Sequence, residues 1–217
     1  MLRSHRWATR SINTFNSKLK YKIKEGSAGA QEIYGIIQGG IYKDLRDESI
    51  DFNQNKIKTF GIAIGGSLGS TKQEMKEVVN YTASKLNSTR PVHLLGIGDP
   101  IDIWTFVEQG IDTFDCVSPT RLARHGSALI KGKRGKINLK NKIYKEQLNP
   151  IDKYCSCYTC KNFTLSYLHH LFASKELLAL QLITNHNLFF MNKLMETIRT
   201  SIKENNYKEK KREWCGE

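Results

Sequence analysis

Three of the five cysteines of the chain stand within six residues, in the stretch YCSCYTC at positions 154–160. Clustered thiols with an imidazole nearby are the usual composition of a metal site, whereas a disulfide framework spreads its cysteines along the chain. One imidazole added to Cys155, Cys157 and Cys160 would complete the four ligands that tetrahedral zinc prefers. A closed site of this kind leaves no position for water, so we expect one structural metal ion and no metal catalysis.

The fourth ligand is not decided by spacing. A helix-compatible stretch after the cysteines contains His169, His170 and His186. The two adjacent histidines point to different sides of a helix, whereas His186 stands in an Asn-His-Asn setting where a helix could return to the loop. His186 is thus a candidate beside the other two, and thiols without any metal remain the alternative.

A second group of chemically capable residues lies at the ends of expected strands. Four short segments rich in branched and aromatic residues end in glycine or aspartate and predict buried parallel strands: residues 32–40, 60–66, 92–99 and 111–117. Helices are predicted between them, at residues 71–86 with Ser70 or Thr71 as N-cap, and at residues 100–109. Alternating strands and helices predict βα units, whose chemistry sits at the carboxyl ends of the strands.

Four βα units are half of an eight-stranded barrel. The predicted sheet is therefore either an open sheet or one half of a larger closed one. After residue 120 the chain becomes basic and rich in glycine, and residues 136–144 predict a hairpin. A long helical region is expected at 163–203, followed by a charged tail that we expect to be frayed. The expected domains are a half barrel at 1–130, a metal-binding subdomain at 131–203 and a disordered tail at 204–217.

The chain of 217 residues is basic, with 34 lysines and arginines against 21 acidic residues and a net charge of +13. Such a charge attracts polyanions and makes a nucleic-acid partner plausible, although a solvated basic surface explains it equally well. No apolar run suggests a membrane span, and the amino-terminal residues do not resemble a signal peptide. We therefore expect a cytoplasmic protein with reduced thiols and no membrane partner.

Several of these motifs together resemble the bacterial-type tRNA-guanine transglycosylases, the queuosine-inserting enzymes. The resemblance runs from about residue 4 to residue 202 through IIQGG, GIAIGG, HLLGIGDP, FDCVSPTRLARHG, the Cys-x-Cys-x-x-Cys loop, YLHHL and TNHNL. It implies an α/β fold of the (βα)8 TIM-barrel family, of which this chain resembles the last four βα units plus the zinc-binding subdomain and its carboxyl-terminal helix. It also implies zinc held by the three cysteines and His186.

The resemblance further implies roles at the strand ends. Asp115 matches the carboxylate that forms a covalent ribosyl intermediate when guanine in a tRNA anticodon is exchanged for a 7-deazaguanine. Asp112, one strand turn earlier, is expected to be structural. The residues expected around the purine base are Gln38, Gly39, Gly40, Gly65, Gly66 and Leu95, because an amide and exposed main-chain N–H groups can read the edge of a base.

The tRNA contacts implied by the resemblance lie in the segment PTRLARHG. Arg121 and Arg124 match arginines that hold the anticodon-loop backbone, a task suited to cationic forks on phosphate. Lys131, Lys133 and Arg134 extend that basic surface or form a solvated loop. The implied partners are a tRNA with a GUN anticodon, the 7-deazaguanine base, and a second copy or a companion chain that supplies the missing half of the barrel.

The loop after Gly66 departs from the family pattern. Many bacterial members read Leu-x-Val-Gly-Glu there, and this chain reads Ser-Leu-Gly-Ser-Thr at residues 67–71. Gly69 in place of valine would enlarge the pocket and Thr71 in place of glutamate removes an acceptor, so queuine is favoured slightly over 7-aminomethyl-7-deazaguanine.

The larger departure is that the second catalytic aspartate of the family has no counterpart in this sequence. We therefore expect the chain alone to be inactive and prone to association. The alternatives are a non-catalytic, zinc-containing tRNA-binding or partner subunit, an inactive truncated product, and an unrelated zinc-ribbon nucleic-acid binder.

Overall fold

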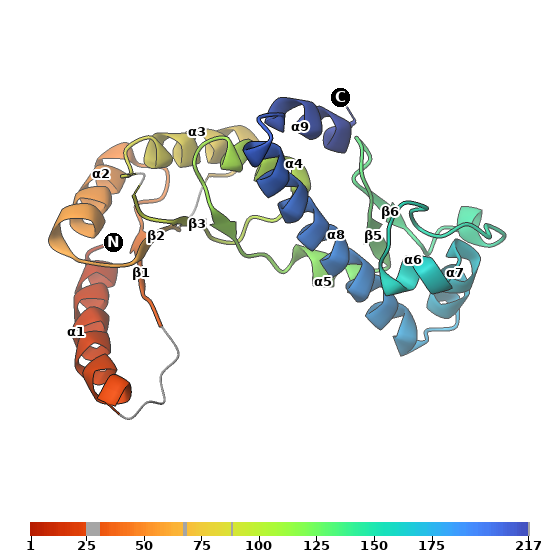
Figure 1. Ribbon diagram of the computed structural model, residues 1–217, viewed down its shortest axis with the longest axis horizontal. Helices are drawn as coiled ribbons and strands as arrows, with labels where there is room; N and C mark the ends of the chain where they lie inside the picture. Colours follow the sequence, from red (N-terminus) through yellow and green to blue (C-terminus); the bar gives the residue numbers. More distant parts are fainter. Residues whose placement is uncertain (25–30, 67–68, 88, 217) are drawn as a thin grey trace. The chain divides into compact units, whose positions relative to one another are not determined.

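The computed structural model describes residues 1–24, 31–66, 69–87 and 89–216, without the side chains of residues 19–24. These residues form two compact units (Figure 1). Unit 1 comprises Met1–Ile97 and Thr105–Asp115, and unit 2 comprises Gly98–Trp104 and Cys116–Glu217. Each unit is described by itself below.

Unit 1 is built on a parallel sheet in which the strands follow one another in chain order, β1-β2-β3-β4. The strands are β1 (Tyr34–Ile37), β2 (Gly61–Ile64), β3 (Val92–Leu94) and β4 (Thr113–Phe114). Ile37 is in register with Ile64, Ile64 with Leu94, and Leu94 with Phe114, so all four strands end at one edge of the sheet. The predicted four parallel strands are confirmed, although each is shorter than its apolar segment.

The helices of unit 1 are α1 (Leu2–Lys24), α2 (Lys43–Asp51) with a π-helical extension at Phe52–Lys56, and α3 (Lys72–Ala83), together with the end of α4 (Pro100–Val107). Helix α3 begins where predicted: the Thr71 side chain accepts a hydrogen bond from the Glu74 N–H, and the Glu74 carboxylate accepts one from the Thr71 N–H. Helix α1 was not predicted. The sheet buries Ile64, Leu94 and Phe106 with other apolar side chains of this unit.

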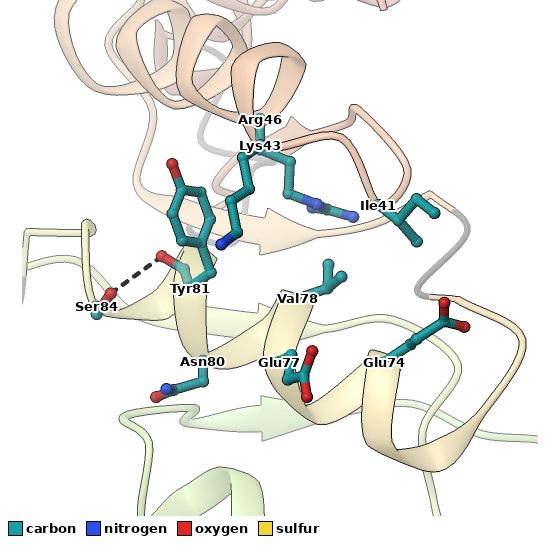
Figure 2. Close-up of a pocket in the computed structure, with 9 residues that line it drawn as sticks. All are labelled: Ile41, Lys43, Arg46, Glu74, Glu77, Val78, Asn80, Tyr81 and Ser84. Carbon is teal, nitrogen blue, oxygen red and sulfur yellow. Dashed lines mark hydrogen bonds between the residues drawn. The ribbon is translucent and has the colours of Figure 1, made fainter.

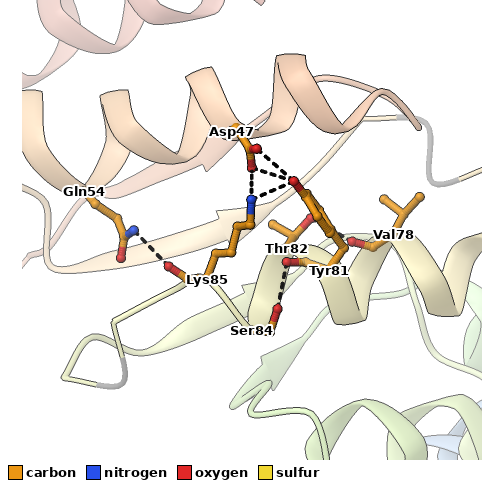
Figure 3. A network of polar contacts seen from close by, with 7 residues as sticks. All are labelled: Asp47, Gln54, Val78, Tyr81, Thr82, Ser84 and Lys85. Carbon is orange, nitrogen blue, oxygen red and sulfur yellow. Dashed lines mark hydrogen bonds and ion pairs between the residues drawn. The ribbon is translucent and has the colours of Figure 1, made fainter.

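A polar network links α2 to α3 (Figure 3). The Asp47 carboxylate accepts hydrogen bonds from Lys85 Nζ at 2.6 Å and from the Tyr81 hydroxyl at 2.8 Å. The bond from Lys85, followed by that from Tyr81, lowers the pKa of Asp47 below its usual value. Because these groups are exposed, the network orients the helices and adds little stability.

Unit 2 carries the remaining elements. These are α5 (Ser118–Arg124), β5 (Ser127–Leu129), β6 (Lys136–Asn138), a 3-10 turn at Lys142–Tyr144, α6 (Tyr158–Asn162), α7 (Leu165–Ala173), α8 (Leu177–Lys203) and α9 (Tyr207–Cys215). Strands β5 and β6 pair antiparallel. Helix α8 packs against α5 and β5, and the apolar core between them includes Ala123, Leu139, Leu168 and Ile183.

Two predictions for unit 2 were wrong in detail. The hairpin joins β5 to β6 through a turn at Gly132 and Gly135, both with positive φ, and does not lie within residues 136–144. The helical region at 163–203 is divided into α7 and α8, because the backbone turns at Lys175, which has a φ of 57°. Both errors concern turns, which apolar spacing does not locate.

The tail expected to be frayed forms helix α9. Trp214 is 5% exposed and contacts Phe190 edge-on, with ring centroids 5.3 Å apart. The Tyr207 hydroxyl donates a hydrogen bond to the Trp104 carbonyl. Tyr207 and Trp214 are seven residues apart and therefore share one face of the helix, which anchors α9 despite its charged sequence. Among the described residues, no helix has the length and apolar character needed to cross a membrane.

Candidate active site and metal centre

The four predicted metal ligands lie together in unit 2. One donor atom from each of Cys155, Cys157, Cys160 and His186 falls within 4.8 Å of all the others. His186 Nδ1 is 3.8, 3.5 and 3.4 Å from the three sulfurs in chain order. Three thiols and an imidazole, mostly buried, are the donor set of a closed tetrahedral site, so these residues can hold a metal ion.

The other two histidines are directed elsewhere. His169 Nδ1 lies 2.8 Å from the Leu139 carbonyl oxygen, and His170 is exposed on α7. The structure therefore selects His186 from the three candidates.

Helix α8 and strand β5 orient the His186 ring. The ring Nε2 lies 2.8 Å from the Leu129 carbonyl and donates a hydrogen bond to it, which leaves the Nδ1 lone pair facing the sulfurs. The neighbouring Asn187 is fully buried and accepts a bond from the Leu129 N–H at 2.8 Å while donating to the Pro119 carbonyl at 2.9 Å. These bonds fix α8 against α5 and β5, and so fix the imidazole.

The three thiols differ in how readily they ionise. A hydrogen bond from Cys160, opposed by burial, lowers the pKa of Cys157. The same Cys157–Cys160 bond, together with burial, raises the pKa of Cys160, and burial raises the pKa of Cys155. The Cys157 thiol is thus the most readily ionised of the three, and a metal ion would displace protons from the thiols that it binds.

Asp115 follows β4 in unit 1, with one carboxylate oxygen held and the other free. Oδ1 accepts hydrogen bonds from the Gly96 N–H at 3.1 Å and from His93 Nε2 at 3.0 Å. Oδ2 accepts no hydrogen bond from any residue that the structure describes, and 61% of the side chain is exposed. A carboxylate held in this orientation can attack an electrophilic carbon through Oδ2.

The tautomer of His93 follows from its two contacts. Nε2 faces a carboxylate oxygen that only accepts, so Nε2 carries the proton, and Nδ1 accepts from the Thr113 hydroxyl at 2.8 Å. His93 and Thr113 are register partners on β3 and β4. His93 is a site residue that sequence analysis missed, because its role depends on the register between β3 and β4, which the strand pattern does not give.

Asp112 has the structural role expected of it, since its Oδ2 accepts a hydrogen bond from the Val92 N–H at 2.7 Å.

The structure brings the predicted base-binding residues together at the ends of β1, β2 and β3. A Cβ atom added to Gly65 would lie 3.1 Å from Leu95 Cδ1, and one added to Gly66 would lie 2.9 Å from Gln38 Oε1. The two glycines therefore allow the amide of Gln38 and the side chain of Leu95 to approach the same stretch of backbone. Gly39, with a φ of 133°, permits an equally close approach to the backbone of Arg46, where its Cβ would lie at 2.8 Å.

Arg46 of α2 is a second residue that sequence analysis missed. Its Nε donates to the Gly40 carbonyl at 2.7 Å and its Nη2 to the Gly65 carbonyl at 3.1 Å, so one guanidinium connects the loops after β1 and β2. The residue is 1% exposed, and burial lowers its pKa. Figure 2 shows Lys43 extending from α2 toward Tyr81 of α3 and the Arg46 guanidinium directed toward Ile41. Both residues line a cavity of about 540 Å³.

Comparison with known proteins identifies the family. The family described as queuine tRNA-ribosyltransferase matches residues 1–217. The chain belongs to this family. It is 45% identical over 188 residues to the queuine tRNA-ribosyltransferase of Roseiflexus sp. (strain RS-1), covering 86% of this chain and 47% of the relative.

Other relatives give the same result. The chain is 43% identical to the queuine tRNA-ribosyltransferase of Dictyoglomus turgidum, covering 98% of this chain and 52% of the relative. It is 41% identical to that of Vibrio vulnificus (strain YJ016), covering 95% and 52%. The chain thus spans about half the length of the curated relatives it matches.

The two arginines expected to contact tRNA in this family lie in unit 2. Arg121 and Arg124 are exposed on α5, three residues apart and so on neighbouring positions of one helix face. Neither forms an ion pair with a described carboxylate. Both guanidinium groups are therefore free to bind an anionic ligand.

The family loop that departs from the usual pattern is described from Gly69 onward, whereas Ser67 and Leu68 lie outside the described residues. Gly69 has a φ of 105°, and a Cβ there would lie 2.6 Å from Glu74 Cβ. Thr71 caps α3, and Glu74 Oε2 accepts bonds from the Ser70 N–H and hydroxyl, both at 2.8 Å. The backbone conformation and the helix cap therefore also explain why glycine stands at position 69 and threonine at position 71, in addition to the expected effect on the pocket.

Proposed function

We propose that this chain is the nucleophile-bearing and zinc-binding half of a tRNA-guanine transglycosylase. The reaction is the exchange of guanine at the wobble position of a tRNA with a GUN anticodon for a 7-deazaguanine, in queuosine biosynthesis. The observation that carries the proposal is Asp115, whose Oδ1 is held by His93 and Gly96 while Oδ2 stays free beside the end of a sheet that also presents Gln38.

Asp115 acts as a nucleophile in two displacements. Oδ2 attacks C1′ of the ribose, the bond from C1′ to N9 of guanine breaks, and guanine leaves with that electron pair and takes up a proton. The resulting ester is then attacked at C1′ by N9 of the 7-deazaguanine, which loses its proton and regenerates the carboxylate. The family resemblance assigns proton transfer at the bases to a second aspartate, which has no counterpart in this chain.

His93 and Gly96 orient the nucleophile. Both donate to Oδ1, so they fix the plane of the carboxylate and direct the lone pairs of Oδ2 outward.

The residues around the purine are Gln38, Gly39, Gly65, Gly66 and Leu95. The amide of Gln38 can donate to a carbonyl and accept from a ring N–H, and Leu95, which is 36% exposed, offers an apolar surface to the base. The backbone N–H groups of the glycines approach the base edge because no side chain covers them. In the loop after Gly66, Gly69 and Thr71 slightly favour queuine over 7-aminomethyl-7-deazaguanine.

The metal of this proposal is one structural Zn²⁺, held by Cys155, Cys157, Cys160 and His186. It would link the cysteine loop and α6 to helix α8. It would offer no open coordination position for a reaction, because the four side chains complete a tetrahedral shell. Arg121 and Arg124 bind phosphates of the anticodon loop, in keeping with the net charge of +13.

The assembly and location of the enzyme complete the proposal. The remaining half of the barrel belongs to the same polypeptide, a companion chain or a second copy, and the enzyme works in the cytoplasm, where thiols stay reduced. A non-catalytic tRNA-binding subunit would have no need for the free oxygen of Asp115 or for Gln38 at the same sheet edge. We therefore prefer the interpretation that the chain is part of a catalytic subunit.

A chimaera tests the function. This chain replaces the matching segment of the Dictyoglomus turgidum relative, and the purified chimaera is assayed for exchange of labelled guanine into tRNA. We expect exchange and a covalent tRNA–protein adduct on denaturing gels, both abolished by Asp115→Asn and retained by Asp112→Asn if the latter folds. A folded, zinc-containing chimaera that binds tRNA without exchanging guanine would contradict the proposal.

A further inference from the structure

Unit 2 contains a basic cavity that the proposed catalytic residues do not use. Its volume is about 200 Å³, and its walls are the segment before α4, helix α5, the β5–β6 turn and the end of α9. The polar side chains that line it are Asp99, Ser118, Lys133, Arg134, Lys136 and Trp214. All belong to one compact unit, so the cavity is a feature of that unit alone.

Positive charge dominates the lining. The three cations are exposed and form no ion pair with a described acidic residue. Lys133 and Arg134 lie on the β5–β6 turn, and Lys136 begins β6. The only carboxylate of the lining is Asp99, whose Oδ1 accepts a hydrogen bond from the Ile101 N–H at 3.0 Å at the start of α4. Three cations against one carboxylate give the cavity a net positive charge.

Trp214 adds a hydrogen-bond donor that lacks an acceptor. The residue is 5% exposed, and its indole Nε1 has no hydrogen-bond partner among the described residues. A buried N–H without an acceptor is costly, and an anionic ligand that reached Nε1 from the cavity would provide one. Lys131 Nζ lies 4.4 Å from the centroid of the Trp214 ring, so a further cation lies close to this tryptophan.

The turn that carries the cations is fixed in place. The Gly132 N–H donates to the Trp214 carbonyl at 2.9 Å, the Gly135 N–H donates to the Gly132 carbonyl at 3.0 Å, and both glycines have positive φ. Helix α9 therefore positions the lysines and the arginine instead of leaving them on a mobile hairpin. Preorganisation of this kind lowers the cost of binding an anion.

We propose that this cavity binds a backbone phosphate of the RNA substrate, beyond the phosphates held by Arg121 and Arg124. Its volume suits one phosphate group and is too small for a nucleotide. Two of its walls come from the segments that follow β3 and β4 in the chain, and in (βα)8 barrels the loops after the last two strands are a frequent phosphate site. Ser118 and Leu122 of α5 line the cavity, and Arg121 and Arg124 stand on the same helix, so an RNA strand bound to α5 would reach it.

This inference rests on the proposed function for the identity of the ligand, and it can be tested on the chain as it is. The indole N–H of Trp214 is observed by ¹⁵N NMR, assigned among the three tryptophans of the chain by Trp214→Phe, during titration with an anticodon stem-loop RNA. We expect the Trp214 signal to shift with RNA. Lys133→Gln with Arg134→Gln should weaken RNA binding about tenfold or more and reduce the salt dependence by about one to two charges.

A matched control separates the cavity from general charge. Lys142→Gln with Lys145→Gln removes the same charge from exposed positions of the same unit that do not line the cavity. Equal weakening by both double variants, or an unmoved Trp214 signal at saturating RNA, would overturn the proposal. If a double variant loses zinc or its folded spectrum, Lys133→Gln alone replaces it.

Titration with inorganic phosphate distinguishes the source of the anion. A Trp214 shift with inorganic phosphate and none with RNA would identify a small-anion site and reject the RNA assignment. Because Asp115 does not line the cavity, Asp115→Asn should retain the RNA-dependent shift. Failure of guanine exchange in the chimaera with a preserved shift would therefore contradict the catalytic proposal alone.

Discussion

His93 and Asp115 face each other across β3 and β4, with Nε2 and Oδ1 3.0 Å apart. Because the His93 ring also accepts from the Thr113 hydroxyl at 2.8 Å, its N–H is committed to the carboxylate. The arrangement acts on the nucleophile without touching the reacting carbon, so His93 is a positioning residue in the proposed reaction.

In the chimaera, His93→Phe should slow formation of the covalent tRNA adduct by about 10- to 100-fold, which corresponds to loss of one hydrogen bond to a charged group of about 1.5–3 kcal/mol. Single-turnover kinetics measure this rate. His93→Gln, which keeps a donor, should recover part of it, and the affinity for tRNA should be unchanged. A His93→Phe variant with the adduct rate of the parent would reject the role.

Removal of the metal should unfold unit 2 locally. The Cys157 sulfur caps α6 by accepting the Cys160 N–H at 3.3 Å, and His186 is fully buried, so the four ligands hold α6 to α8. We expect about one zinc per chain by elemental analysis, loss of zinc in Cys157→Ser and His186→Gln, and a lower melting temperature after treatment with a chelator.

The matched control for the metal site is His169→Gln, which removes an imidazole of the same unit that contacts Leu139 and no thiol. It should keep its zinc. Full zinc content in His186→Gln would show that another residue completes the site.

Acidification should loosen helix α1. His5 stacks on Phe52 with ring centroids 4.1 Å apart and contacts Ser49 Oγ at 3.1 Å, and burial lowers its pKa, with Glu48 opposing the effect. Folding thus favours neutral His5. Its contribution is complete above the unfolded pKa of about 6.5 and is lost as the pH falls through that value toward the lower folded pKa.

Hydrogen exchange of the α1 amides measures this effect. Protection should fall between pH 7 and pH 5 in the parent chain, and His5→Gln, which cannot become charged, should show a smaller change over that interval. The same pH dependence in both chains would assign it to other groups.

The sequence was most informative where a chemical group follows from residue type alone. Asp115, the three cysteines, and the glycines after β1 and β2 could be named as candidates because strand ends and ligand spacing are visible in a linear pattern. His186 could not be chosen from spacing, since its selection depends on the hydrogen bond to Leu129, which is 57 residues away.

The missed features all depend on partners distant in sequence. His93 acquires its role from Asp115 on the next strand, and Arg46 from carbonyls on two different loops. Helix α9 was mistaken for a disordered tail because its charged residues outnumber the two aromatic side chains that anchor it. A long-range contact of this kind leaves no local pattern in the sequence.

Arg46 provides the last test, because its guanidinium satisfies the Gly40 and Gly65 carbonyls at once. Arg46→Met fills a similar volume and leaves both carbonyls without this donor, so the free energy of unfolding of the chain should fall by about 1–3 kcal/mol in urea titrations. Since the two loops form the expected base pocket, KM for guanine in the chimaera should rise more than kcat falls.

Lys43→Met is the matched control, because Lys43 lines the same cavity from the same helix and its Nζ lies 5.2 Å from the centroid of the Tyr81 ring, away from both loops. It should leave KM for guanine unchanged. Arg46→Lys can reach at most one of the two carbonyls and should fall between the parent and Arg46→Met. If Arg46→Met and Lys43→Met changed KM equally, the effect would belong to the cavity between α2 and α3, and the connection between the two loops would have no part in base binding.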